Sequence, residues 1–276
     1  MNCYNNIILN YDNINKRYKL KIKDNISTIV DCMFDKWIDM CYILTMENST
    51  RITSFMNQLN RHCLYHTITI QVNKGYKICK KNLYKQSSIQ DINESYLNVF
   101  KNAKANNYKN IMILEDDFFF ENINQEIADS IGKFINNNYY HIYNLGPIGH
   151  ISIPSFNVHH KSLISTTSHS VIYSSYYIEH YIENYGEAMK HNSDLYWNKI
   201  EIIKYKYIVP LCFQTFPITD NQANWEIPQW FIKFAIFSIK ILKLDKMHQP
   251  GYNILNIMGY IPFIILLVLL IYLYYL

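Results

Sequence analysis

The order of apolar and polar positions predicts strands that alternate with helices over the middle of the chain. Four apolar runs have the length of strands, and three segments between them carry apolar residues at helical spacing. The strands are expected at residues 39–46, 65–72, 110–114 and 139–145, and the helices at 49–59, 93–105 and 123–135. Ser49 or Thr50 is expected to cap the first helix. This alternation predicts an α/β fold with a mixed, mostly parallel sheet and helices on both faces.

Residues 1–36 form an N-terminal extension ahead of the alternating part. The extension holds two short strand-like runs, at 7–9 and 18–22, and the pattern assigns it no role. Its first residues lack the basic start and the long apolar core of a signal peptide, so no cleaved leader is expected.

The C-terminal end predicts attachment to a membrane. No charged residue lies between Gln249 and Leu276, and residues 254–276 are almost entirely apolar. Because about 20 apolar residues in a helix cross the hydrocarbon core, a transmembrane helix is expected here, with a very hydrophobic core helix as the alternative. Residues 229–248 predict an amphipathic segment on the membrane surface, or else a core-packing helix with a solvated lysine face.

The lysines that flank the predicted span all lie on its N-terminal side. By the positive-inside rule, this bias predicts a single-pass C-terminal anchor with the large domain facing the cytosol. The six cysteines are widely spaced and form no Cys-x-x-Cys pair: Cys3, Cys32, Cys41, Cys63, Cys79 and Cys212. Neither a zinc cluster nor a disulfide framework is expected, and buried reduced thiols agree with a cytosolic domain.

The composition argues against nucleic acid as a partner. Charged residues make up 17% of the chain, the net charge is only +4, and no basic stripe is present. Two histidine pairs, His159 with His160 and His62 with His66, lack a third ligand at a suitable spacing, so neither pair predicts a metal site.

One apolar strand runs directly into three carboxylates, Glu115, Asp116 and Asp117, and three phenylalanines follow. Acids at the end of a buried strand lie in the crevice where α/β sheets bind ligands, and they can share a divalent cation there. A solvated acidic turn is the alternative, and the apolar residues on both sides disfavour it. In an extended chain Glu115 and Asp117 point to the same side, so this pair is the predicted site for Mn²⁺ or Mg²⁺. Asp116 joins the site if a turn has already begun.

Several short blocks, taken in order, resemble glycosyltransferase family 25, which includes lipopolysaccharide and collagen galactosyltransferases. The resemblance covers about residues 37–216. The similar blocks are 42–51 with Arg51, Ser95 twenty positions before Glu115, Leu114 to Asp117, 140–146, 168–174 with His169, Asp194 after the expected helix at 175–189, and 209–214. Tyr96 stands where the family has His.

This resemblance implies a GT-A-like catalytic domain at residues 37–228. It implies metal-dependent, inverting transfer of a hexose, galactose or glucose, from a UDP-hexose or another nucleoside-diphosphate sugar to a glycan, protein or lipid acceptor. A divalent cation, held by Glu115 and Asp117 with His169, would neutralise the departing pyrophosphate as a Lewis acid. A lone buried histidine with a structural role is the alternative reading of His169.

The resemblance also implies roles for four further residues. Asp194 is the candidate base that takes the proton of the acceptor hydroxyl, with Asp116 as the second catalytic carboxylate. Arg51 and Ser95 are the candidate contacts to the donor. The alternatives are a helix cap for Asp194 and an exposed helix residue for Arg51.

Two functions from other classes remain open. The first is a membrane-anchored binding or scaffold protein that has the fold without catalysis, which Tyr96 in place of His favours. The second is a metal-dependent hydrolase, in which the acids hold a metal that activates water. The sequence shows no further His or Asp set at a spacing typical of such hydrolases.

Overall fold

A computed structural model describes residues 3–12, 15–20, 31–214, 229–244 and 246–275. Parts of the sequence predictions lie outside these residues. They are residues 1–2, 13–14 and 21–30 of the N-terminal extension, residues 215–228 of the expected catalytic domain, residue 245 of the expected amphipathic segment, and residue 276.

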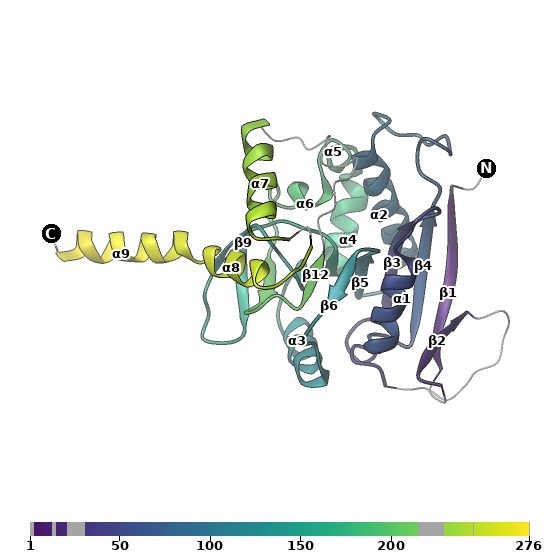
Figure 1. Cartoon of the computed structure of the whole chain (residues 1–276), viewed down its shortest axis with the longest axis horizontal. Helices are drawn as coiled ribbons and strands as arrows, with labels where there is room; N and C mark the ends of the chain where they lie inside the picture. Colours follow the sequence, from purple (N-terminus) through teal and green to yellow (C-terminus); the bar gives the residue numbers. More distant parts are fainter. Residues whose placement is uncertain (1–2, 13–14, 21–30, 215–228, 245, 276) are drawn as a thin grey trace.

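The centre of the described fold is a ten-stranded sheet with helices on both faces (Figure 1). In spatial order the strands are β2 (Arg17–Leu20), β1 (Tyr4–Asp12), β4 (Thr67–Asn73), β3 (Met40–Met46), β5 (Asn110–Glu115), β10 (Ser170–Ser174), β7 (Ile142–Asn144), β11 (Lys204–Tyr207), β9 (His159–Ser165) and β8 (His150–Ile153). The α/β class and the mixed sheet are confirmed.

The expectation of a mostly parallel sheet is wrong. Among the described strands, only the pairs β4–β3, β3–β5 and β7–β11 are parallel, and the other six neighbouring pairs are antiparallel. The reason is local: β1–β2 and β8–β9 are hairpins, and β10 runs back between β5 and β7. Two of the three parallel pairs join β4, β3 and β5, which the apolar runs identified, and the third joins β7 to β11.

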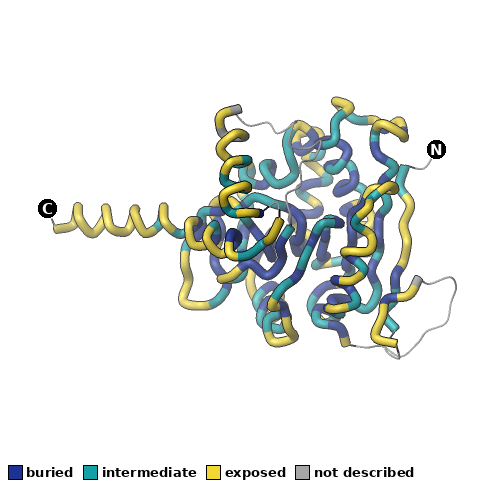
Figure 2. Tube along the Cα trace, in the orientation of Figure 1, coloured by how far each residue is buried: buried dark blue, intermediate teal, exposed yellow. Residues whose placement is uncertain are grey.

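Helices cover the two faces of the sheet in pairs. The first face carries α1 (Ile52–Arg61) and α3 (Gln125–Asn137), and the second carries α2 (Ser88–Ala105) and α4 (Ser175–Glu183). Strand β5 is apolar throughout because both of its faces are covered. Met112 and Leu114 pack toward α1 and α3, while Ile111 and Ile113 pack toward α2 and α4. All four side chains are fully buried. Figure 2 shows the strands at the centre of the sheet in dark blue, the colour of buried residues.

The helix boundaries differ from the predictions mainly at the N-terminal ends. Helix α1 begins at Ile52 without a side-chain cap, so neither Ser49 nor Thr50 caps it. Helix α2 begins at Ser88, five residues before the prediction, because Ser87 caps it by accepting a hydrogen bond from Gln90 N. The helix expected at 175–189 ends at Glu183, and a short helix α5 (Tyr185–Ala188) follows.

The N-terminal extension belongs to the same sheet, since β1 pairs antiparallel with β4. The expectation of reduced thiols is wrong for four cysteines, because Cys3–Cys79 and Cys32–Cys63 are disulfides, while Cys41 and Cys212 are free and buried. The two cysteines of each disulfide are 76 and 31 residues apart in sequence, respectively, so only the tertiary structure brings them together. The thiol argument for a cytosolic domain is therefore lost.

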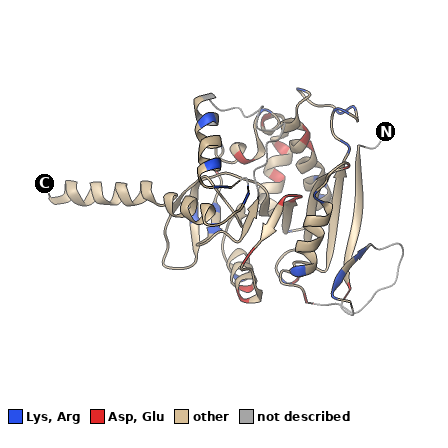
Figure 3. Cartoon of the chain, in the orientation of Figure 1, with Lys and Arg blue, Asp and Glu red and all other residues tan. Residues whose placement is uncertain are grey.

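The remaining elements are β6 (Phe118–Phe120), β12 (Cys212–Gln214), α6 (Ser193–Tyr196), α7 (Gln229–Ile241), α8 (Gly251–Met258) and α9 (Ile261–Tyr275). Strands β6 and β12 form a separate antiparallel pair, which explains the phenylalanines that follow the acids. Within the described residues, one helical stretch is long and apolar enough to cross a membrane, namely Gly251–Tyr275, and only 11% of its most apolar window is buried. It carries no charged side chain (Figure 3).

Candidate functional site

The carboxyl ends of the parallel strands open onto a cavity of about 1020 Å³. Thr45 at the end of β3, Asn73 at the end of β4 and Glu115 at the end of β5 all line it. This edge is where α/β sheets bind ligands, because the loops that follow parallel strands converge there. Of the predicted site residues, seven were named, and all except His169 line this cavity: Arg51, Ser95, Glu115, Asp116, Asp117 and Asp194.

Asp116 is held by three donors from the segment that follows β3. Its Oδ2 accepts from Thr45 Oγ1 at 2.7 Å and from Ser49 Oγ at 2.6 Å, and Arg51 Nη1 donates to its Oδ1 at 2.8 Å. The side chain is about nine-tenths buried. Ser49, which the sequence predicted as a helix cap, is therefore used to hold this carboxylate. Asp116 thus joins β5 to the start of α1.

Glu115 is held from the opposite side of β5. Its Oε1 accepts from Tyr96 OH at 2.8 Å and from Ser168 Oγ at 2.6 Å. Burial raises the pKa of Glu115, and the two hydroxyl donors oppose that rise. Tyr96, which stands where family 25 has His, therefore supplies a hydrogen bond to the acid cluster. Sequence reasoning missed Ser168, although this residue directly precedes His169 in one of the similar blocks.

Asp117 is the least satisfied of the three acids. Its Oδ1 is buried and has no hydrogen-bond partner within the described part of the chain, and its Oδ2 lies 3.8 Å from Arg51 Nη1. Burial raises the pKa of Asp117 to about 7, the charge of Glu115 adds to the rise, and Arg51 opposes it. A buried carboxylate oxygen without a partner beside like charges is a position that a cation would stabilise.

Asp194 approaches the acids from α6, on the other side of the cavity. Its Oδ2 accepts from Thr167 N at 3.2 Å, and burial raises its pKa. The negative charge of Asp194 also raises the pKa of Glu115, so the two carboxylates interact electrostatically. The N-cap of α6 is Asn192, so Asp194 does not act as the predicted helix cap.

His169 lies behind the cavity wall. Its Nε2 faces the carbonyl oxygen of Cys212 at 3.2 Å, and burial lowers its pKa to about 4, so the ring is neutral. Gly146 leaves the space that this ring fills, because a Cβ at Gly146 would lie 2.8 Å from His169 Nε2. The carbonyl oxygen of His169 accepts from Glu115 N at 2.9 Å, but its side chain does not line the cavity with Glu115 and Asp117. Its buried Nδ1 has no hydrogen-bond partner within the described residues. No group of three His, Cys, Asp or Glu side chains is poised for a metal among the residues described here.

Ser95 and Arg51 line the cavity, and both are already engaged by neighbours. Ser95 Oγ donates to Asp91 O at 3.0 Å and accepts from Asn73 Nδ2 at 2.9 Å. Arg51 pairs with Asp116, and its guanidinium is about one-third exposed, so part of it still faces the cavity. The donor contacts that the resemblance implies for both residues stay predictions, and Arg51 is not the exposed helix residue given as its alternative, since it precedes α1 and binds Asp116.

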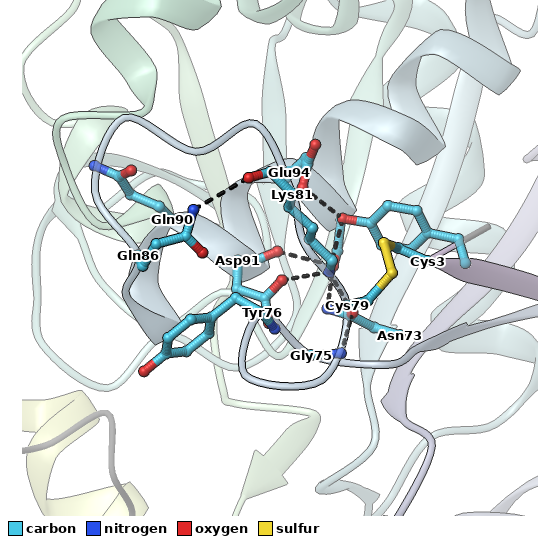
Figure 4. A network of polar contacts seen from close by, with 12 residues as sticks. Cys3, Asn73, Gly75, Tyr76, Cys79, Lys81, Gln86, Gln90, Asp91 and Glu94 are labelled. Atoms are coloured by element: carbon cyan, nitrogen blue, oxygen red, sulfur yellow. Dashed lines mark hydrogen bonds and ion pairs between the residues drawn. A yellow bond between two sulfur atoms is a disulfide. The ribbon is translucent and has the colours of Figure 1, made fainter. Parts of the chain in front are cut away.

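A buried polar network fixes the wall formed by the loop after β4 (Figure 4). Lys81, with a side chain only 1% exposed, donates to Asn73 Oδ1, to Asp91 Oδ1 and to Tyr4 OH. The Cys3–Cys79 disulfide ties the same loop to the start of β1. Because these residues are far apart in sequence, no local pattern could have revealed the network.

Neither a comparison with protein-family models nor a search of the curated proteins finds a match to this chain. The resemblance to glycosyltransferase family 25 therefore rests on the short blocks and their order.

Proposed function

We propose that the chain is a metal-dependent, inverting glycosyltransferase of GT-A-like architecture. It would transfer galactose or glucose from a UDP-hexose to an acceptor hydroxyl. The observation that carries this proposal is the set of four carboxylates, Glu115, Asp116, Asp117 and Asp194, around one cavity at the ends of parallel strands. The cavity lies at the upper end of the range of about 300–1,000 Å³ usual for small-molecule sites, which leaves room for a donor and an acceptor.

The side chains present suit a hard divalent cation. Asp117 offers a buried carboxylate oxygen without a described partner, and Glu115 offers a second carboxylate from the same strand end. Asp117 and Glu115 would therefore hold Mn²⁺ or Mg²⁺, together with oxygens of the donor diphosphate. The ion, when bound, neutralises charge on the departing diphosphate. Arg51 adds a fixed positive charge at the same end of the cavity.

Asp194 is the proposed base. It lines the cavity from the side opposite β3, and its raised pKa brings it closer to that of an effective proton acceptor near neutral pH. Asp116 is proposed as a positioning residue, since its carboxylate oxygens already accept from Thr45, Ser49 and Arg51. This assignment differs from the direct catalytic role that the sequence suggested for Asp116.

A second candidate is a binding protein without catalysis. The engaged side chains of Ser95 and Arg51 favour it, because two expected donor contacts are satisfied by the protein itself. Such a protein would bind a nucleotide sugar in the cavity and release no product.

We also propose that the helical stretch Gly251–Tyr275 anchors the chain in a membrane. Its length and composition support this role. The lysines before it favour a cytosolic domain, whereas the disulfides Cys3–Cys79 and Cys32–Cys63 favour an oxidising compartment. Ending the chain at Tyr260 should release it from membranes while α8 stays in place, whereas a truncated chain that still pellets with vesicles would assign the membrane contact to α7 instead. Protease protection of the full chain in sealed vesicles would determine the side.

The transferase is tested with the full chain in detergent, UDP-galactose or UDP-glucose, and Mn²⁺, by measuring UDP release. Asp117→Asn should abolish Mn²⁺-dependent release, and Glu126→Gln, at an exposed position on α3 outside the cavity, should not change it. Full activity in Asp117→Asn would refute the site assignment. Nucleotide binding without turnover in the wild-type chain would favour the binding protein.

A further inference from the structure

The cavity has a second, apolar end that the acid cluster does not explain. Phe234, Ala235 and Ile239 of α7, together with Leu244 and with Leu255 of α8, line it there. These residues lie on α7, on α8 and on the turn that follows α7, in the part of the chain that leads to the proposed anchor. One continuous cavity therefore joins a polar end, suited to a nucleotide sugar, to an apolar end built by the C-terminal helices.

Helix α8 is docked on the domain by buried polar contacts, so the apolar end has a fixed position. Asn256 Oδ1 accepts from Lys206 Nζ at 2.8 Å and lies 3.1 Å from His150 Nε2. Tyr260 OH contacts His160 Nδ1 at 2.7 Å. Burial lowers the pKa of Lys206 to about 7 and that of His150 to about 3, as expected for side chains held inside a contact.

The length of the last helix brings the membrane close to this contact. Helix α9 has 15 residues, which span about 22 Å, less than the hydrocarbon thickness of about 30 Å. The rest of the span falls on the end of α8 and on Tyr260, so the domain surface that holds Asn256 and Tyr260 would lie at the membrane interface. Beside it, Ile257 and Met258 are exposed apolar residues. Helix α7 runs across the direction of α9 on the side from which α9 leaves the domain (Figure 1). Helix α7 thus lies where a membrane surface would be.

Helix α7 presents an exposed apolar stripe of the kind that inserts into a membrane surface. Trp230, Phe234, Phe237 and Ile241 recur at intervals of four, three and four residues, and their exposed fractions lie between 59% and 70%. Exposed Lys233 and Lys240 flank the stripe, where they can meet anionic headgroups (Figure 3). Phe234 belongs to the stripe and also lines the cavity, so the two apolar surfaces meet at this residue.

We propose that the acceptor is a membrane lipid with a hydroxyl head group, which enters the cavity beside α7 while its chain stays in contact with the bilayer. This inference rests on the proposed transferase function. In the reaction, the lipid hydroxyl oxygen forms a bond to the anomeric carbon of the hexose. The bond from that carbon to the diphosphate oxygen breaks, UDP leaves with the electron pair, and Asp194 takes the hydroxyl proton.

The test uses the full chain in phosphatidylcholine vesicles with UDP-hexose, labelled in the sugar, and Mn²⁺. One arm contains vesicles doped with diacylglycerol, ceramide and a polyprenyl alcohol, and the other contains plain vesicles with glycerol and free sugars in solution. Label should appear in the organic extract of the first arm. UDP release with label only in water-soluble products would overturn the lipid acceptor alone, whereas no UDP release in either arm would overturn the transferase and this inference with it.

Two variants test the route of entry. Ile239→Glu places a charge on the apolar wall of the cavity, and Ser238→Trp fills the space beside that wall. Each variant should lower lipid labelling about ten-fold, which is the loss expected when two lipid methylenes lose apolar contact. Binding of UDP, measured by calorimetry, should stay unchanged in both variants. Ile8→Glu, at an exposed position on β1, is the matched control and should label lipid at the wild-type rate. Wild-type lipid labelling in both cavity variants would refute the proposal.

Discussion

Replacement of Asp117 by Asn should stabilise the metal-free protein at alkaline pH while removing its activity. The pKa of Asp117 is raised from 3.8 to about 7, first by burial and then by the charge of Glu115. Between these pH values the folded protein holds a proton that the unfolded chain has released. The free energy of unfolding therefore falls as the pH rises from about 4 to 7, and above pH 7 the whole cost of the buried charge is present.

The size of this cost follows from the same shift. About three pKa units correspond to about 4 kcal/mol, which is a ceiling because Glu115 shares the repulsion and Arg51 relieves part of it. We expect Asp117→Asn to raise the free energy of unfolding by half of this ceiling, roughly 2 kcal/mol at pH 8. For a chain of 276 residues this amounts to a rise in Tm of about 3–4 °C. At pH 4, where Asp117 is protonated in the folded protein, the gain should disappear.

The assay is thermal unfolding of the detergent-solubilised full chain in EDTA at pH 4, 6 and 8, with Glu126→Gln as the exposed control. Addition of Mn²⁺ at pH 8 should raise the Tm of the wild type and leave that of Asp117→Asn unchanged, because the proposed ion binds the missing carboxylate. The reasoning is refuted if Asp117→Asn has the wild-type Tm, or a lower one, at pH 8 in EDTA.

Three further outcomes are expected. Asp116→Ala removes the acceptor of two buried hydroxyl donors and of a partly exposed Arg, so unfolding should cost about 3 kcal/mol less in denaturant titration. Tyr96→Phe removes one donor to Glu115 and should lower kcat more than it raises the KM for donor, read from UDP release. Cys3→Ser should destabilise the chain by about 4 kcal/mol because the Cys3–Cys79 loop is long, and non-reducing peptide mapping of the wild type should recover the linked pair.

The local features of the site could be predicted from the sequence. Strand β5 and its acids are read from seven consecutive residues, because a strand buried on both faces is apolar throughout. The parallel neighbours β3 and β4 follow from similar runs. These three strands suffice to place the acids at a ligand-binding edge, and this placement does not depend on the order of the other strands.

The partners of the acids could not be predicted, since they come from distant segments. Ser49 has the spacing of a helix cap, yet Asp116, 67 positions away, takes its hydroxyl. Strand β11 reads as Lys-Tyr-Lys-Tyr, and Lys206 on it is buried with hydrogen bonds to Asn256 of α8 and to the carbonyl oxygens of Tyr207 and Ile208. The Cys3–Cys79 disulfide follows the same rule, because these cysteines meet only when β1 lies beside β4.

Asp116, Asp117 and Asp194 differ in what they contribute to stability, and this difference favours the proposed enzyme over a binding protein without catalysis. Asp116 is satisfied by three donors, so the fold alone accounts for its presence. Asp117 and Asp194 have pKa values raised by burial, and Asp117 keeps a buried oxygen without a described partner. Groups that cost stability and face a common cavity are typical of catalytic sites. A protein needed only for binding would be more stable with Asn at both positions, so the proposed catalysis accounts better for these acids.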